Sequence, residues 1–221
     1  AMVEIGMRYA DPSIETAMKN FKAAGITDVT ILPLYPQYAR ATTESTFMKI
    51  DELNRQFNFK LRKIDRFYDR PEFINAFVET AQYHLQGKKA DHYLFTYHGL
   101  PASQNRKMNP EESYRKQCMR TSELIAEKMG LQKSDYTTSF QSRLGPAKWI
   151  QPYTDGVLKE LAQSGVKNLA VLCPSFVSDC LETIDEIGVE GKEIFESAGG
   201  ESFYLVPCLN ERVDYLVSFL Q

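Results

Sequence analysis

Hydrophobic and polar positions follow two recurring patterns along the chain. Short apolar runs predict buried strands, and between them lie longer stretches in which apolar residues recur with the period of a helix. The predicted strands are residues 3–8, 29–34, 61–67, 93–97, 136–141, 168–173 and 202–207. The predicted helices lie near residues 13–24, 44–57, 71–86, 110–129, 153–164, 181–198 and 210–220. Strand–helix alternation at this spacing is typical of parallel sheets covered by helices.

A polar segment at residues 86–90 divides the chain into two parts with similar strand–helix units. We therefore predict an α/β fold of two doubly wound domains, flavodoxin-like or Rossmann-like, with parallel sheets. The expected domains are residues 1–88 and 89–221. The first is expected to be incomplete, because it has the smaller sheet and the chain opens directly with a strand.

The composition excludes several classes of protein. With 43% hydrophobic and 25% charged residues the chain is an ordinary globular sequence. A net charge of −3 without any block of basic residues argues against a nucleic-acid binder. No apolar run approaches the roughly 20 residues that cross a bilayer. The scattered cysteines favour reduced thiols and a cytoplasmic protein; they are Cys118, Cys173, Cys180 and Cys208.

Several predicted strands end in polar or aromatic segments. His98 directly follows an apolar strand, and in open α/β sheets ligands bind outside the carboxyl ends of the strands. If both sheets present these ends to one cleft, it gains four aromatic and three polar side chains, which suits a flat apolar ligand. They are Tyr35, Tyr38, Trp149, Phe176, His98, Arg143 and Glu182. In the alternative, the aromatic residues are core and Arg143 caps a helix or pairs with a carboxylate.

The predicted helix at residues 181–198 begins with an acidic series. Asp179 and Glu182 have the spacing of a capping box, and Glu186, Glu190 and Glu193 continue on one face. A solvated acidic face explains most of these charges. However, like charges four residues apart repel by a few tenths of a kcal/mol. An acidic ladder that starts at a cleft also suits a path for metal ions or protons.

With these segments the chain resembles the ferrochelatases, the terminal enzymes of haem synthesis. The resemblance runs from about Val3 to the end of the chain. The matching motifs are LPLYPQY at 32–38 with TT at 42–43, FTYHGLP at 95–101, FQSRLGP at 140–146, WIQPYTD at 149–155 and PSFVSDCLET at 174–183.

The resemblance implies insertion of Fe²⁺, as a substrate, into protoporphyrin IX with loss of two pyrrole protons and without a permanently bound cofactor. It implies that His98 is a metal ligand or pyrrole base and that Glu182 is its partner carboxylate. Glu186 and Glu190 match an acidic ladder for metal delivery or proton exit. The expected substrate-binding residues are Tyr35, Tyr38, Ser142, Arg143, Trp149 and Phe176.

The chain departs from the family pattern in three respects. Cys180 occupies the position of a second histidine in some relatives. No iron–sulfur cluster is expected, because Arg40 replaces the loop cysteine of cluster-containing relatives and no cysteine-rich tail follows. The family's opening strand and apolar lip are missing. We therefore expect self-association through an unpaired sheet edge, and any peripheral membrane contact would use the missing lip.

Two other functions remain open at this point. The chain could be a chelatase for another tetrapyrrole or metal, such as coproporphyrin or cobalt, or a porphyrin-binding fragment without turnover. For the catalytic reading we predict that His98 and Glu182 face each other across an interdomain cleft and share one pocket with Trp149.

Overall fold

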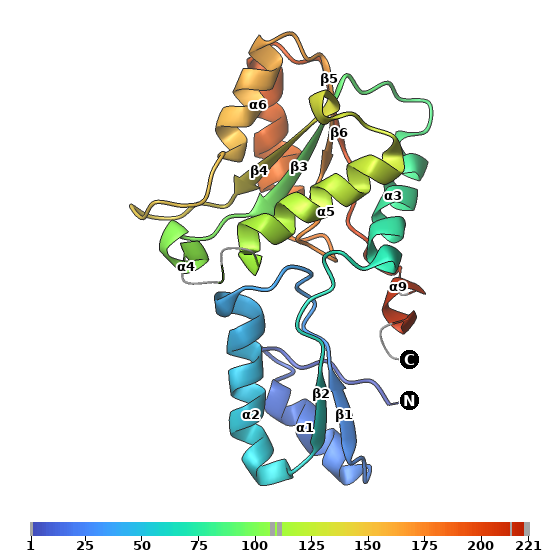
Figure 1. Ribbon diagram of the computed structural model, residues 1–221, viewed down its shortest axis with the longest axis vertical. Helices are drawn as coiled ribbons and strands as arrows, with labels where there is room; N and C mark the ends of the chain where they lie inside the picture. Colours follow the sequence, from blue (N-terminus) through green and yellow to red (C-terminus); the bar gives the residue numbers. More distant parts are fainter. Residues whose placement is uncertain (1, 107–108, 110–111, 213, 219–221) are drawn as a thin grey trace. The chain divides into compact units, whose positions relative to one another are not determined.

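The computed structural model describes residues 2–106, 109, 112–212 and 214–218 (Figure 1). The chain divides into two compact units, Ala1–Arg66 and Phe67–Gln221. This boundary lies ahead of helix α3 (Pro71–Leu85), not after it as the sequence predicts. The reason is that α3 packs within the second unit, against α5 (Tyr114–Met129) and α9 (Asp214–Val217).

The first unit holds a small parallel sheet of two strands, β1 (Asp28–Ile31) and β2 (Lys60–Lys63). Its helices are α1 (Ile14–Ala23), the π-helix η1 (Arg40–Glu44) and α2 (Ser45–Phe57). Apolar side chains from both helices and both strands close a single core. The buried members of this core are Ile14, Met18, Val29, Ile50, Leu53 and Phe59.

The strand predicted at residues 3–8 does not form in this unit. The main chain of Met7 instead bonds back to the start of α1: its N–H donates to the Pro12 carbonyl, and its carbonyl accepts from Ile14 N–H. These bonds occupy both main-chain polar groups of Met7, so neither is available to pair with a strand. The prediction of a strand here was wrong.

The second unit is built on a parallel sheet of four strands in the order β4-β3-β5-β6. The strands are β3 (His92–His98), β4 (Tyr136–Gln141), β5 (Asn168–Leu172) and β6 (Ser202–Leu205). All four predicted strands of this region are present, which confirms an α/β fold with parallel sheets.

Helices cover both faces of this sheet (Figure 1). Leu94 packs with α6 (Thr154–Gln163) and α8 (Lys192–Ser197) on one face. The Tyr97 hydroxyl bonds Ser122 of α5 on the other, because side chains an odd number of residues apart point to opposite faces of a strand. The remaining helices are α4 (Ala102–Arg106), a 3-10 turn η3 (Lys133–Asp135), α7 (Leu181–Ile184) and the π-helix η4 (Glu186–Gly191).

Three helix predictions need adjustment. The acidic helix predicted at 181–198 is interrupted by the π-helix η4, which separates α7 from α8. The helix predicted at 110–129 begins at Tyr114, and residues 110 and 111 lie outside the described part of the chain. The predicted helix at 210–220 is helical at Asp214–Val217, while residues 213, 219 and 220 are not described.

The strand order creates a switch point between β3 and β5. After β3 the chain places β4 on one side of it, then crosses to place β5 on the other side. In open α/β sheets the crevice outside the carboxyl ends of two such strands is the usual ligand site. His98 ends β3, and residues 173–176 follow β5, so the fold brings these two segments to that crevice. Within the described residues, no helix is both long and apolar enough to span a membrane.

Candidate active site

The main chain of His98 is held by two side chains at the switch point. The β3–β5 ladder ends at the pair Phe95 and Leu172, beyond which the strands have no further paired residues. The His98 N–H instead donates to Ser175 Oγ at 3.0 Å, and the Tyr114 hydroxyl donates to the His98 carbonyl at 2.9 Å. Side chains thus replace the missing ladder bonds and fix the histidine where the strands separate.

The ring of His98 has a defined tautomer. Its Nδ1 lies 2.7 Å from the Gly99 carbonyl oxygen, which can only accept a hydrogen bond. Nδ1 therefore carries the proton, and in the neutral ring Nε2 keeps its lone pair. The residue is half-buried, not enclosed in the core. An imidazole held in this way can take a proton or bind a metal ion through Nε2.

Two aromatic rings flank His98. Its ring centroid lies 6.5 Å from that of Trp149 and 6.3 Å from that of Phe176, with tilts of 53° and 58°. Trp149 comes from the segment after β4, and its Nε1–H donates to the Leu144 carbonyl at 3.0 Å. The structure thus brings together three residues that the sequence placed at strand ends. Together they place one imidazole next to two large apolar rings.

The loops after β3 and β4 are joined by main-chain bonds. Ile150 N–H donates to the Leu100 carbonyl at 2.9 Å, and Ala102 N–H donates to the Lys148 carbonyl at 2.8 Å. Gly99 N–H donates to the Gln141 carbonyl at 2.8 Å. A Cβ at Gly99 would lie 2.7 Å from that carbonyl oxygen and 3.1 Å from the Trp149 ring. The glycine therefore permits the close approach that seats Trp149 beside His98.

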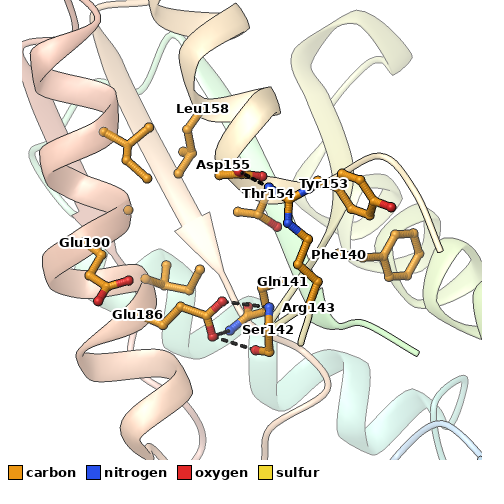
Figure 2. Close-up of a pocket in the computed structure, with 13 residues that line it drawn as sticks. Phe140, Gln141, Ser142, Arg143, Tyr153, Thr154, Asp155, Leu158, Glu186 and Glu190 are labelled. Carbon is orange, nitrogen blue, oxygen red and sulfur yellow. Dashed lines mark hydrogen bonds and ion pairs between the residues drawn. The ribbon is translucent and has the colours of Figure 1, made fainter. Parts of the chain in front are cut away.

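A second group of predicted residues lines a pocket of about 160 Å³ (Figure 2). Ser142 N–H donates to Glu186 Oε1 at 2.6 Å, and the Ser142 hydroxyl donates to Oε2 of the same carboxylate. Ser142 has a φ of 61°, a left-handed conformation that is uncommon for a serine. Figure 2 shows Glu186 directed at Ser142, with Glu190 farther along the helix on the same pocket wall.

Arg143 pairs within its own segment of the chain. Its Nη2 lies 2.7 Å from Asp155 Oδ2, and its guanidinium lies 4.4 Å from the centroid of the Tyr153 ring. The alternative reading, in which Arg143 pairs with a neighbouring carboxylate, is therefore the one that the structure shows. Both partners are substantially exposed, so the ion pair contributes little to stability.

Glu182 lies half-exposed on the first turn of α7, but it does not take part in a capping box. The box is formed by Cys180 and Thr183, one residue later than predicted, with Cys180 N–H donating to Thr183 Oγ1 at 3.0 Å. The Glu182 main-chain carbonyl accepts from Gln141 Nε2 at 2.7 Å. This bond ties the start of the acidic helix to the end of β4.

Asp179 stabilises the loop that precedes this helix. Its carboxylate accepts from Asn210 Nδ2 at 2.7 Å, Cys208 N–H at 3.1 Å and the Thr183 hydroxyl at 3.2 Å. Burial acts to raise the pKa of this carboxyl group, but the donors outweigh it and hold the pKa below its usual value.

Two of the predicted site residues belong to the other unit. Tyr35 and Tyr38 belong to the first unit, where Tyr35 is exposed and the Tyr38 ring lies 5.7 Å from the Arg66 guanidinium. His98 and Glu182 belong to the same unit, so they cannot face each other from opposite domains as predicted.

The pocket of Figure 2 is lined by Glu186 and Glu190 but not by His98, Glu182 or Trp149. This pocket is therefore not the one predicted for the latter three residues, and their shared pocket stays a prediction. Across the described residues, no three His, Cys, Asp or Glu side chains form a ready-made metal site.

Sequence reasoning missed three residues that position the site. Ser175 and Gln141 lie in strand-end segments that were singled out, yet nothing in the pattern gave them a role. Tyr114 lies in a predicted helix, where a tyrosine reads as packing. A polar residue directly after a parallel strand is the signal that could have found the first two.

A family model and the curated relatives both point to the ferrochelatases. A protein-family model described as Ferrochelatase matches residues 1–220. A ferrochelatase of Bdellovibrio bacteriovorus is 40% identical over 235 residues, which cover 99% of this chain and 70% of that protein. A ferrochelatase of Pseudomonas fluorescens is 45% identical over 231 residues, covering 95% of this chain and 67% of that protein.

Among solved structures, SirB from Bacillus subtilis with Fe³⁺ superposes with a TM-score of 0.70 at 15% identity, covering 98% of this chain and 79% of that one. The sirohydrochlorin chelatase SirB from Bacillus subtilis subspecies spizizenii in complex with cobalt gives a TM-score of 0.65 at 14% identity. At these identities the likeness shows the fold alone.

Replacing Gly99 with alanine tests the close approach at this site. The new Cβ would clash with the Gln141 carbonyl and press on Trp149, so we expect the tryptophan to move. Because Trp149 is the single tryptophan of the chain, a shift in its fluorescence maximum reports that movement directly. We also expect unfolding to become easier by about 1–3 kcal/mol, as for other overpacked sites.

Gly156→Ala is the matched control, because a Cβ at Gly156 in helix α6 meets no atom within 4 Å. It should leave the fluorescence unchanged. Identical spectra for Gly99→Ala and the unmodified chain would show that the approach is not as tight as described.

Proposed function

The chain belongs to the ferrochelatase family of metal-inserting enzymes, and we propose that it inserts Fe²⁺ into protoporphyrin IX to form protohaem, the last step of haem biosynthesis. The observation that carries this proposal is His98, whose Nδ1 bonds the Gly99 carbonyl and whose ring lies close to those of Trp149 and Phe176. A flat macrocycle needs apolar walls, and the exchange of its two pyrrole protons for a metal needs a base at its face.

In the proposed reaction two pyrrole nitrogens lose their protons as four nitrogens bind Fe²⁺. His98 Nε2 either accepts a pyrrole proton or holds the incoming metal, and Glu182 serves as its partner carboxylate. An imidazole and a carboxylate bind Fe²⁺ loosely enough to release it, and either can carry a proton. The aromatic walls would hold the ring in a bent form, so that the pyrrole lone pairs face the metal.

Glu186 and Glu190 are the proposed metal path. Both line the pocket of Figure 2, where Glu190 is exposed and Glu186 is half-buried. Carboxylate oxygens suit a hydrated divalent cation, which keeps several of its waters. The pair could therefore guide a metal ion from solvent toward Glu182.

The proposed macrocycle contacts divide into two groups. Trp149 and Phe176 are supported by their position beside His98. Tyr35 and Tyr38 come from the first unit, and their proposed role rests on their place after a predicted strand and on the family resemblance. Ser142 and Arg143 are engaged with Glu186 and Asp155, so contact with substrate would require them to exchange these partners.

We also propose that no iron–sulfur cluster is bound. Cys118 and Cys173 are fully buried, and burial raises the pKa of both thiols. Burial raises that of Cys208 as well. Cluster iron is held by thiolates, which this burial disfavours. Visible absorption by a cluster in anaerobically purified protein would contradict the proposal.

The reduced cysteines support a cytoplasmic location, which fractionation would test. Self-association remains part of the proposal as well. In the part of the first unit that the structure describes, the sheet has two strands, so each strand has one edge without a strand partner. Such edges recruit further chains. A single species of monomer mass in sedimentation velocity would contradict it.

The first test is metalloporphyrin formation. The purified chain should convert protoporphyrin IX with Fe²⁺ or Zn²⁺, and His98→Ala should lower kcat by more than about hundredfold, as for loss of a positioned acid or base. His84→Ala is the control, because His84 is an exposed histidine on α3.

Unchanged turnover in His98→Ala would remove the histidine from the mechanism. Binding of porphyrin without metal uptake by the unmodified chain would favour a binding module instead. Faster turnover of coproporphyrin or cobalt in competition assays would reassign the substrate.

The second test concerns the acidic pair. Glu186→Gln with Glu190→Gln removes two charges from the proposed metal path and keeps their shape. We expect the KM for the metal to rise roughly tenfold, while the affinity for porphyrin stays the same. Glu193→Gln is the matched control, because Glu193 is an exposed member of the same acidic series. If the double variant showed the same metal kinetics as the Glu193→Gln control and the unmodified chain, the pair would be a solvated face.

A further inference from the structure

We propose that Gln141 and Thr96 are positioning residues for metal insertion, because a one-way chain of buried hydrogen bonds through them fixes Glu182 and Glu186 relative to His98. The inference rests on the proposed function. It adds residues that contact neither the metal nor the macrocycle and that act through the groups described above.

The chain of bonds lies in the core of the second unit. Its members are 4% exposed or less; they are Thr96 of β3, Ser139 and Gln141 of β4, and Thr154 of α6. Ser139 Oγ lies 2.8 Å from Thr154 Oγ1, and Thr154 Oγ1 lies 2.8 Å from Thr96 Oγ1. Thr96 Oγ1 lies 2.9 Å from Gln141 Oε1. Buried polar groups are costly unless they are bonded, and here they are bonded to one another.

The direction of these bonds follows from their far end. Gln141 Nε2 lies 2.7 Å from the Glu182 carbonyl and 3.4 Å from Glu186 Oε2. A carbonyl and a carboxylate only accept, so the amide NH₂ must face the helix and Oε1 must face Thr96. Thr96 therefore donates its single hydroxyl proton to Gln141.

The rest of the chain is then determined. Because the Thr96 proton is used, Thr154 must donate to Thr96, and Ser139 must donate to Thr154. Among these four residues only one arrangement of protons satisfies every bond. A network with a single arrangement holds the Gln141 amide in one orientation.

Gln141 joins the two halves of the proposed site. Its main-chain carbonyl accepts from Gly99 N–H, next to His98, while its side chain donates to Glu182 and Glu186. The following residue, Ser142, adds two bonds to Glu186. These bonds reach the chain where α7 is followed by the π-helix η4. Short π-helical segments often lie at functional sites.

Thr96→Val tests the inference, because it keeps the shape of the side chain and removes its proton. Gln141 Oε1 then lacks a donor, and its amide loses the preferred orientation toward the helix. We expect kcat at saturating metal to fall about tenfold with an unchanged KM for porphyrin. Thr96→Ser restores the hydroxyl and should restore kcat, which separates loss of the bond from general damage.

Thr138→Val is the matched control. Thr138 lies on β4 next to Ser139, is 6% exposed, and its hydroxyl has no hydrogen-bond partner among the described residues. Its replacement should leave kcat unchanged and keep or raise the Tm. Both variants replace a threonine hydroxyl with a methyl group, but only Thr96→Val removes a hydrogen bond.

A second measurement is hydrogen exchange of the Gln141 side-chain amide by NMR. Exchange should be slow in the unmodified chain and in Thr96→Ser, and at least about tenfold faster in Thr96→Val. If the unmodified chain is active and Thr96→Val matches it in kcat or in exchange, the inference is overturned. If the unmodified chain forms no metalloporphyrin, the proposed function fails instead, and the positioning role in catalysis fails with it.

Discussion

The two bonds that Gln141 makes in opposite directions are the constraint on which the rest of the site depends. Its main-chain carbonyl holds Gly99 at the end of β3, and its side-chain amide holds the carbonyl of Glu182 at the start of α7. A residue on β4 thereby sets the distance between the loop that carries His98 and the helix that carries the carboxylates. Close packing around it, which excludes even a Cβ at Gly99, makes this arrangement rigid.

The sheet order explains why such ties are needed. At the switch point the strands β3 and β5 lose their ladder, so main-chain groups there need other partners. Ser175 and Tyr114 supply them at His98, and the Gly99 carbonyl is left free to orient the imidazole. The same opening that creates room for a ligand therefore also creates the polar groups that position the histidine.

Much of this could be predicted from the sequence, and the failures have physical causes. The strand at 136–141 was predicted with its observed bounds, and the grouping of His98 with Trp149 and Phe176 followed from their places at strand ends. The hydroxyl chain could not be predicted, because threonine and serine in strands have the same pattern whether or not they are bonded. The π-helix η4 after α7 could not be predicted, because the spacing of apolar residues does not show where a helical turn contains one extra residue.

The central claim is that the neutral ring of His98 keeps its lone pair on Nε2, because Nδ1 donates to the Gly99 carbonyl. Nitrogen-15 NMR of the histidine rings tests it most directly, with His84 and His92 assigned by substitution. For the neutral ring, the account predicts that His98 carries its proton on Nδ1 and that Nε2 has the chemical shift of an unprotonated nitrogen. A proton on Nε2 would contradict the account, because the lone pair that it assigns to proton transfer or metal binding would then be absent.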